Sequence, residues 1–224
     1  MSLSQWARHG MVADVGGAHV EPDAALIRAW QAKIGGLTVD GDAGPKTLRA
    51  LWLRHRPTAG LVVERALAAA ATWGGCVYSM PRSQGGTGWL ADMAPLTACD
   101  CSGFACHVLG VPKGRGLHLF GGLDLGSDGL LAGAGGLLVQ RPLSEARPGD
   151  VIGWPSIWAN GKRDRATGGR VGHVEVCVEV SGASIWTVGC ASSNKPSVRR
   201  ADKSALWRRN GARAMRPAWY QGAT

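Results

Sequence analysis

The chain has 224 residues, enough for one sizeable domain or for a small one and a medium one. Hydrophobic residues make up 45% and charged residues 18%, which excludes an intrinsically disordered protein, and no apolar run approaches the roughly 20 residues of a membrane-spanning helix. The net charge of +9 is concentrated near the C-terminus, which favours an anionic partner.

The N-terminal residues, Met1 to His9, lack the basic start and apolar core of a Sec-type signal peptide. We therefore expect synthesis in the cytoplasm, a reducing compartment in which thiols normally stay free. Whether any of the six cysteines forms a disulfide stays open at this point.

Residues 23 to 54 form a unit of two short helices. Apolar residues recur there at helical spacing, namely Ala25, Ile27, Trp30, Ile34, Leu48, Leu51 and Trp52. Gly35-Gly36 end the first helix, and Pro45 is placed as the first residue of the second. The turn Asp40-Gly41-Asp42-Ala43-Gly44-Pro45-Lys46-Thr47, with the preceding Gln31, resembles the small helical peptidoglycan-binding module. The alternative is a helical hairpin that only packs against the rest of the chain.

A linker is predicted over residues 54 to 60, which contain Pro57 and Gly60, and an alanine-rich helix over residues 61 to 73. These features predict a small all-α domain at residues 1–56 and a second domain at residues 57–224.

Asp100-Cys101-Ser102-Gly103-Phe104 begins the next apolar helical run, which Gly110 and Pro112 end. A cysteine at the start of a helix is where a thiolate nucleophile is expected, because the helix terminus carries partial positive charge. A buried structural thiol is the alternative.

Strands are predicted over residues 151 to 154, 171 to 180 and 185 to 188, with edge strands near residues 198 to 200 and 214 to 219. His173 opens the longest of them, about seventy residues after Cys101. The fold class is therefore α+β, and a helix-borne cysteine can meet a strand-borne histidine in it.

These segments resemble the NlpC-type cell-wall peptidases, which are papain-like cysteine hydrolases. The resemblance rests on Asp100 to Phe104, on Gly172-His173-Val174-Glu175-Val176, on the turn Arg147 to Ile152, and on Gly75-Cys76-Val77-Tyr78. It implies a papain-like domain in which Cys101 is the nucleophile and His173 the base. It also implies that Tyr78, Asp100 and Ser102 bind the free amino end of a peptidoglycan stem peptide.

The third catalytic member departs from this family pattern. The family carries its orienting residue on the strand after the histidine, where this chain has Gly189 or Cys190, and neither orients an imidazole well. Thr187 and Asn194 are the candidates that remain, and Asn194 is the predicted third member.

The resemblance implies an endopeptidase that cuts between D-glutamate and diaminopimelate and acts at the cell wall. The alternatives are an N-acetylmuramoyl-L-alanine amidase of the CHAP type and a catalytically inactive wall-binding protein. No cofactor or metal is expected. The conceivable zinc ligands are Cys99, Cys101, Cys106 and His107. A structural zinc site usually pairs two short Cys-x-x-Cys or His-x-x-x-His units, and a second unit is missing here. We expect a monomer, unless the protein is part of a phage particle.

The segment from residue 195 onward contains eight basic residues and one acidic residue, with Trp207, Trp219 and Tyr220 among them. We expect it to attract anionic envelope polymers, with a nucleic acid or no specific partner as the alternatives.

Overall fold

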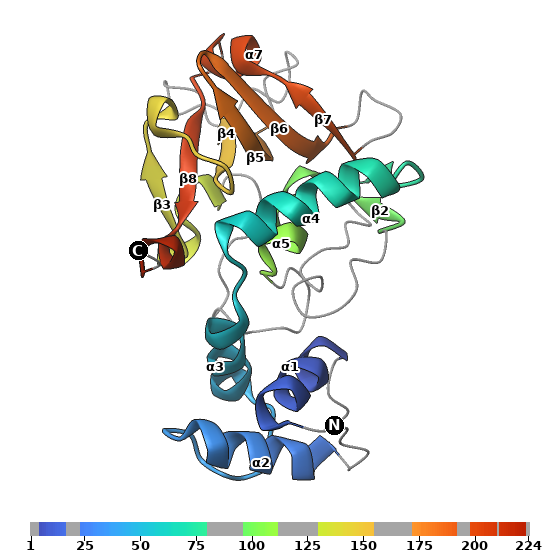
Figure 1. The fold of residues 1–224 in the computed structure, drawn as a ribbon, viewed down its shortest axis with the longest axis vertical. Coiled ribbons are helices and arrows are strands. Elements are labelled where there is room, and N and C mark those ends of the chain that lie inside the picture. The colour runs from blue at the N-terminus through green and yellow to red at the C-terminus, as the bar shows by residue number, and fades with distance from the viewer. Residues whose placement is uncertain are drawn as a thin grey trace, which may run out of the picture.

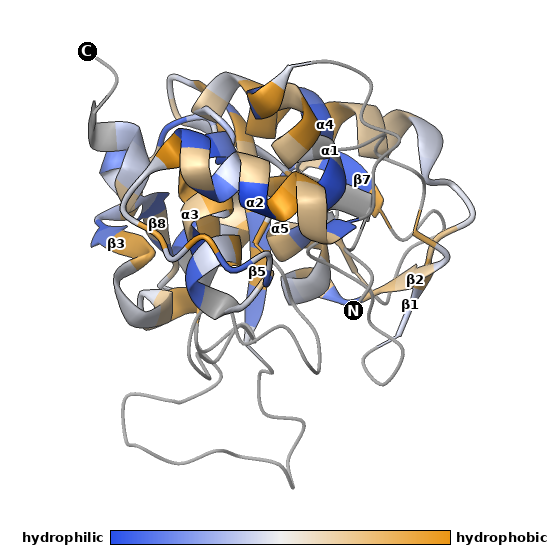
Figure 2. Cartoon of the chain, turned by 90° about the horizontal axis from the view of Figure 1, so that it is seen from below, coloured by the Kyte–Doolittle hydropathy of each residue, from blue (hydrophilic) through white to orange (hydrophobic). Residues whose placement is uncertain are grey.

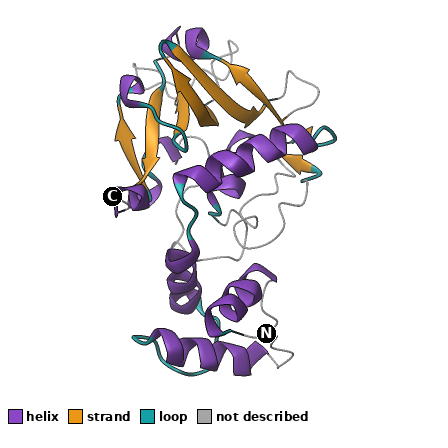
Figure 3. Ribbon diagram, viewed as in Figure 1, coloured by secondary structure: helices purple, strands orange, loops and turns teal. Residues whose placement is uncertain are grey.

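The chain forms a mixed structure of helices and an antiparallel sheet. The structure is a computed structural model, and it describes residues 5–16, 23–79, 96–111, 130–154, 172–191, 198–209 and 211–222. Three N-terminal helices lie at one end of the molecule and a six-stranded sheet at the other (Figure 1). Two further helices, α4 and α5, lie along the sheet (Figure 3). The predicted α+β class is thus confirmed.

The N-terminal helices are α1 (Gln5–Val15), α2 (Asp23–Ile34) and α3 (Pro45–His55). Hydrophilic and hydrophobic residues alternate along them, as expected for amphipathic helices (Figure 2). Asp14, at the end of α1, joins all three: Trp30 Nε1 of α2 donates to it at 2.8 Å, and Arg54 Nε and His55 Nε2 of α3 contact it at 2.9 Å. The helices therefore share a polar junction as well as apolar contacts.

The linker predicted over residues 54 to 60 is shorter in the structure. Helix α3 continues to His55 and α4 already begins at Ala59, because the Thr58 side chain accepts a hydrogen bond from the Leu61 N–H at 3.2 Å and caps α4. Trp52 Nε1 also donates to the Gly110 carbonyl at 2.7 Å, across what was predicted as a domain boundary. The division at residue 56 stays a prediction.

The sheet has the strand order β3-β8-β4-β5-β6-β7, and every neighbouring pair is antiparallel. Its strands are β3 (Leu138–Arg141), β4 (Val151–Trp154), β5 (His173–Ser181), β6 (Ser184–Cys190), β7 (Val198–Asp202) and β8 (Arg213–Pro217). Five of them confirm predicted strands, whereas β3 was not predicted. A separate pair, β1 (Val77–Tyr78) and β2 (Ala98–Cys99), is parallel.

Helices cover both faces of the sheet. The remaining elements are α4 (Ala59–Thr72), α5 (Cys101–Leu109), α7 (Ser204–Arg209) and three 3-10 turns, η2 (Ala134–Gly136), η3 (Leu143–Glu145) and η4 (Ala218–Gly222). Helices α4 and α5 pack on β5 and β6 and share the larger hydrophobic core with the N-terminal helices. A smaller core on the other face contains Trp207 of α7. Among the described residues no helix has the length and apolarity to cross a membrane.

The basic C-terminal segment is built into this fold. It forms β7, α7 and β8, because its apolar residues, such as Val198 and Met215, are buried in the larger core. Arg216 donates to both carboxylate oxygens of Asp150, at 2.9 and 3.0 Å, which fixes the turn that precedes β4. Trp207 is fully buried, so it is not available for stacking on a nucleic acid as that alternative required.

Candidate active site

Cys101 is the first residue of α5, as the sequence predicted. The Asp100 side chain caps this helix by accepting a hydrogen bond from the Gly103 N–H at 2.5 Å, and Gly110 ends it in the left-handed conformation. Cys101 is 5% exposed. Its position at the helix start puts its sulfur in the partial positive field of the helix dipole.

His173 is the first residue of β5 and lies opposite Trp154 of β4. Its side chain, 16% exposed, forms a hydrogen bond with Cys101. The imidazole also packs against two indoles that contact each other: its ring centroid is 5.3 Å from that of Trp154 and 6.1 Å from that of Trp207, with which it stacks at 13°. The structure therefore brings the predicted cysteine and histidine together.

The residue that orients His173 is Glu175, on the same strand. Side chains at positions i and i+2 of a strand share a face, and Glu175 Oε1 lies 2.9 Å from His173 Nε2. Glu175 is fully buried. Thr187 Oγ1 donates to its other oxygen at 2.6 Å, and Lys203 Nζ donates to Oε1. Since Nε2 faces Glu175, Nδ1 is the nitrogen left for Cys101.

The charges of this group reinforce one another. Burial alone lowers the pKa of His173, but hydrogen bonds to Cys101 and Glu175 and the negative charge of Glu175 outweigh it and raise that pKa to about 9. Burial alone raises the pKa of Glu175, but the hydrogen bond and the positive charges of His173 and Lys203 lower it to about 2. At neutral pH the histidine is therefore held as an imidazolium against a carboxylate.

Among the described residues, the carboxylate that contacts the imidazole comes from the strand of His173 itself. Gly189 of β6 is one of the two positions, with Cys190, at which the resemblance expects an orienting residue, and a Cβ there would lie 2.2 Å from Glu175 Cγ. The missing side chain at Gly189 thus makes the space that the Glu175 side chain fills. Thr187 contacts Glu175 rather than the imidazole. Asn194, the predicted third member, lies outside the described residues.

The three predicted substrate-binding residues lie beside Cys101. Tyr78 of β1 is half-buried, and burial together with the negative charges of Cys101 and Asp100 raises its pKa to about 12, so its phenol keeps its proton. Ser102 Oγ donates to Asp100 Oδ1 at 3.0 Å. Asp100 and Ser102 therefore have a structural role in the helix start, and substrate binding by them stays a prediction.

One other residue weighed at the sequence level belongs to the core. His107 is 2% exposed with its ring centroid 5.1 Å from that of Trp73, and burial lowers its pKa to about 4. It is a neutral core histidine at physiological pH, as expected from its place well along α5 from Cys101.

Gln31 organises the turn that resembles the peptidoglycan-binding module. Its side chain is 1% exposed. Its amide nitrogen donates to Asp40 Oδ1 at 2.8 Å and to Thr47 Oγ1 at 3.1 Å, and its amide oxygen accepts from the Gly41 N–H at 3.0 Å. Beside this turn is a pocket of about 440 Å³ lined by residues that include Thr38, Asp42 and Lys46. The residues of the motif thus form a hydrogen-bonded turn with a pocket beside it.

No protein-family model matches the chain, and no curated protein does. Function must therefore be argued from the residues and their geometry alone.

Proposed function

We propose that the protein is a papain-like cysteine hydrolase that cuts amide bonds in peptidoglycan stem peptides. The observation that carries the proposal is the arrangement of Cys101, His173 and Glu175, in which His173 forms hydrogen bonds with both Cys101 and Glu175. Thr187 of the neighbouring strand donates a further hydrogen bond to Glu175. A buried structural cysteine needs no buried imidazolium–carboxylate pair beside it. The cost of burying these charges favours a catalytic role.

The chemistry begins with His173 as an imidazolium, whose Nδ1–H faces the Cys101 thiolate while Nε2–H donates to Glu175. The thiolate attacks the amide carbonyl and forms a tetrahedral oxyanion, which backbone N–H groups at the start of α5 stabilise. His173 then gives its Nδ1 proton to the departing amine, and the carbonyl remains on Cys101 as a thioester. Water attacks the thioester with neutral His173 as the base, which releases the acid and restores the thiolate and the imidazolium.

The substrate we propose is a stem peptide with a free amino end. Tyr78 and Asp100 flank the nucleophile, and a neutral phenol and a carboxylate suit an ammonium group. The family resemblance then favours the bond between the side-chain carboxyl of D-glutamate and diaminopimelate. The turn organised by Gln31, with its neighbouring pocket, is the part we assign to wall binding.

Purified peptidoglycan digestion followed by mass spectrometry tests the proposal. We expect new D-glutamate carboxyl ends and new diaminopimelate amino ends, and no such products from Cys101→Ala. Cys177→Ala is the matched control, since it removes another buried thiol of the domain outside the candidate active site. Free L-alanine amino ends would identify an amidase instead. An absence of products from the unaltered protein, with wall binding retained, would identify an inactive wall-binding protein.

A further inference from the structure

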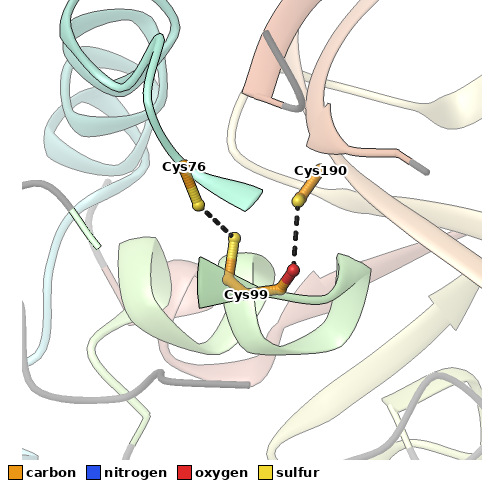
Figure 4. Close-up of side chains that lie close together, drawn as sticks. All are labelled: Cys76, Cys99 and Cys190. Carbon is orange, nitrogen blue, oxygen red and sulfur yellow. Dashed lines mark hydrogen bonds between the residues drawn. The ribbon is translucent and has the colours of Figure 1, made fainter. Parts of the chain in front are cut away.

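Three buried thiols converge next to the candidate active site. They come from three segments: Cys76 precedes β1, Cys99 ends β2, and Cys190 ends β6 (Figure 4). Their sulfur atoms all lie within 4.8 Å of one another, with 3.3 Å between those of Cys76 and Cys99. Each residue is less than 5% exposed. Of the zinc ligands weighed from the sequence, only Cys99 belongs to this cluster.

The backbone disfavours a disulfide between the two closest thiols. In the parallel β1–β2 pair, Tyr78 lies opposite Cys99, and Cys76 is two residues before Tyr78. In extended chains this offset separates the Cα atoms of Cys76 and Cys99 by about 8 Å. Disulfides usually need roughly 4.4 to 6.8 Å. The third thiol, Cys190, is directed at the Cys99 carbonyl, with its sulfur 3.2 Å from that oxygen.

We propose that Cys76, Cys99 and Cys190 bind one thiophilic metal ion, monovalent copper, through three sulfur atoms. Three sulfurs placed about 2.3 Å from a central ion lie roughly 4 Å from one another. That spacing falls between the 3.3 Å that separates the sulfurs of Cys76 and Cys99 and the 4.8 Å within which all three sulfurs lie. Small side-chain rotations therefore suffice to form the site.

The ligand set selects the ion. Among the described residues the group contains no histidine or carboxylate, and a site made only of soft thiolates favours copper(I) over harder ions. A three-coordinate site also suits copper(I) better than zinc, which usually takes four ligands. Helix α5 begins two residues after Cys99 and contributes partial positive charge near the bound thiolates.

Protons compete with the ion. Burial raises the pKa of Cys76, and hydrogen bonding to Cys190 together with burial raises that of Cys99. These thiols are therefore protonated without an ion, and binding releases their protons.

The ion would join the segments that position the candidate active site. Cys99 lies two residues before Cys101 and pairs with Tyr78, and Cys190 follows Gly189. The role of the ion is to fix these segments, and ion binding does not depend on the proposed hydrolysis. Ion binding can therefore be tested in Cys101→Ala, which also removes the Cys101 thiol as a competing ligand.

The experiment is an anaerobic titration of the reduced Cys101→Ala protein with copper(I), in competition with a chromophoric chelator. We expect one equivalent to bind. Adding Cys76→Ser or Cys190→Ser should weaken binding by roughly 100-fold or more, since even outer-shell partners of a metal are worth up to that much. Cys106→Ser and Cys177→Ser, at buried thiols outside the cluster, should leave the affinity unchanged.

X-ray absorption of the copper-loaded Cys101→Ala protein provides a second readout that does not depend on the folding of the serine variants. We expect a first shell of three sulfur atoms at about 2.3 Å. A shell that contains nitrogen or oxygen would overturn the proposal. So would full affinity in Cys76→Ser or Cys190→Ser, or tighter binding of zinc than of copper(I).

Discussion

Replacing Glu175 with glutamine should show how much the carboxylate contributes to the proposed function of Cys101 and His173. The substitution keeps the shape of the side chain and removes its charge. Glu175 contacts His173 Nε2 at 2.9 Å and is fully buried, so no solvent molecule replaces the lost carboxylate. Without it the imidazolium loses its principal negative partner besides Cys101.

The size of the effect follows from the pKa of His173, which is raised from 6.5 to about 9. This difference corresponds to about 3 kcal/mol of preference for the imidazolium. An opposite charge at this distance shifts a pKa by about 1 to 3 units. We expect the pKa of His173 to fall by about 2 units in Glu175→Gln, and turnover near neutral pH to fall about 10- to 100-fold.

The assay is the NMR titration of the His173 ring, because it needs no substrate. Glu179→Gln is the matched control: it makes the same change on the same strand, but at an exposed residue paired with Arg200. The control should leave the titration unchanged. If the folded Glu175→Gln protein titrates His173 as the unaltered protein does, Glu175 does not stabilise the imidazolium and the proposed triad is wrong.

Further changes test the other parts of the structure. Gly189→Ala should displace Glu175, whose Cγ lies 2.2 Å from the added Cβ, and lower both activity and the unfolding temperature, whereas Gly74→Ala, which meets no atom within 4 Å, should do neither. Gln31→Ala should reduce sedimentation with wall sacculi without slowing turnover of a soluble muropeptide; an equal loss on both would contradict separate roles. The last variant replaces three arginines with glutamine, namely Arg208, Arg209 and Arg213. It should weaken wall association at low salt and differ little at 0.15 M, where charges are screened beyond about 8 Å; a salt-independent loss would refute long-range attraction.

Local patterns predicted the positions of the candidate pair, because Cys101 and His173 each lie at the start of a regular element. Asp100 and Gly110 mark the two ends of α5, and their caps depend only on nearby backbone. The alternating run after His173 likewise predicted β5. Chain-local signals of this kind are readable without a structure.

The role proposed for Glu175 depends on how the strands pair. Its spacing of two from His173 indicates only that the two side chains share one face of a strand. What identifies its role is the register of β5 against β6, which places Thr187 and Gly189 around its carboxylate. Lys203 completes the group from beyond β7, and its contact depends on the tertiary fold.

The contact between Glu175 and Gly189 has a consequence for finding sequences that share the proposed site. A search that demands a polar residue on the strand after the histidine would discard such a chain as degenerate. The informative signature is instead a linked pair: a carboxylate two residues after the histidine, with a glycine facing it on the next strand. In natural variation the two positions should change together, because any side chain at position 189 occupies the volume that the carboxylate needs.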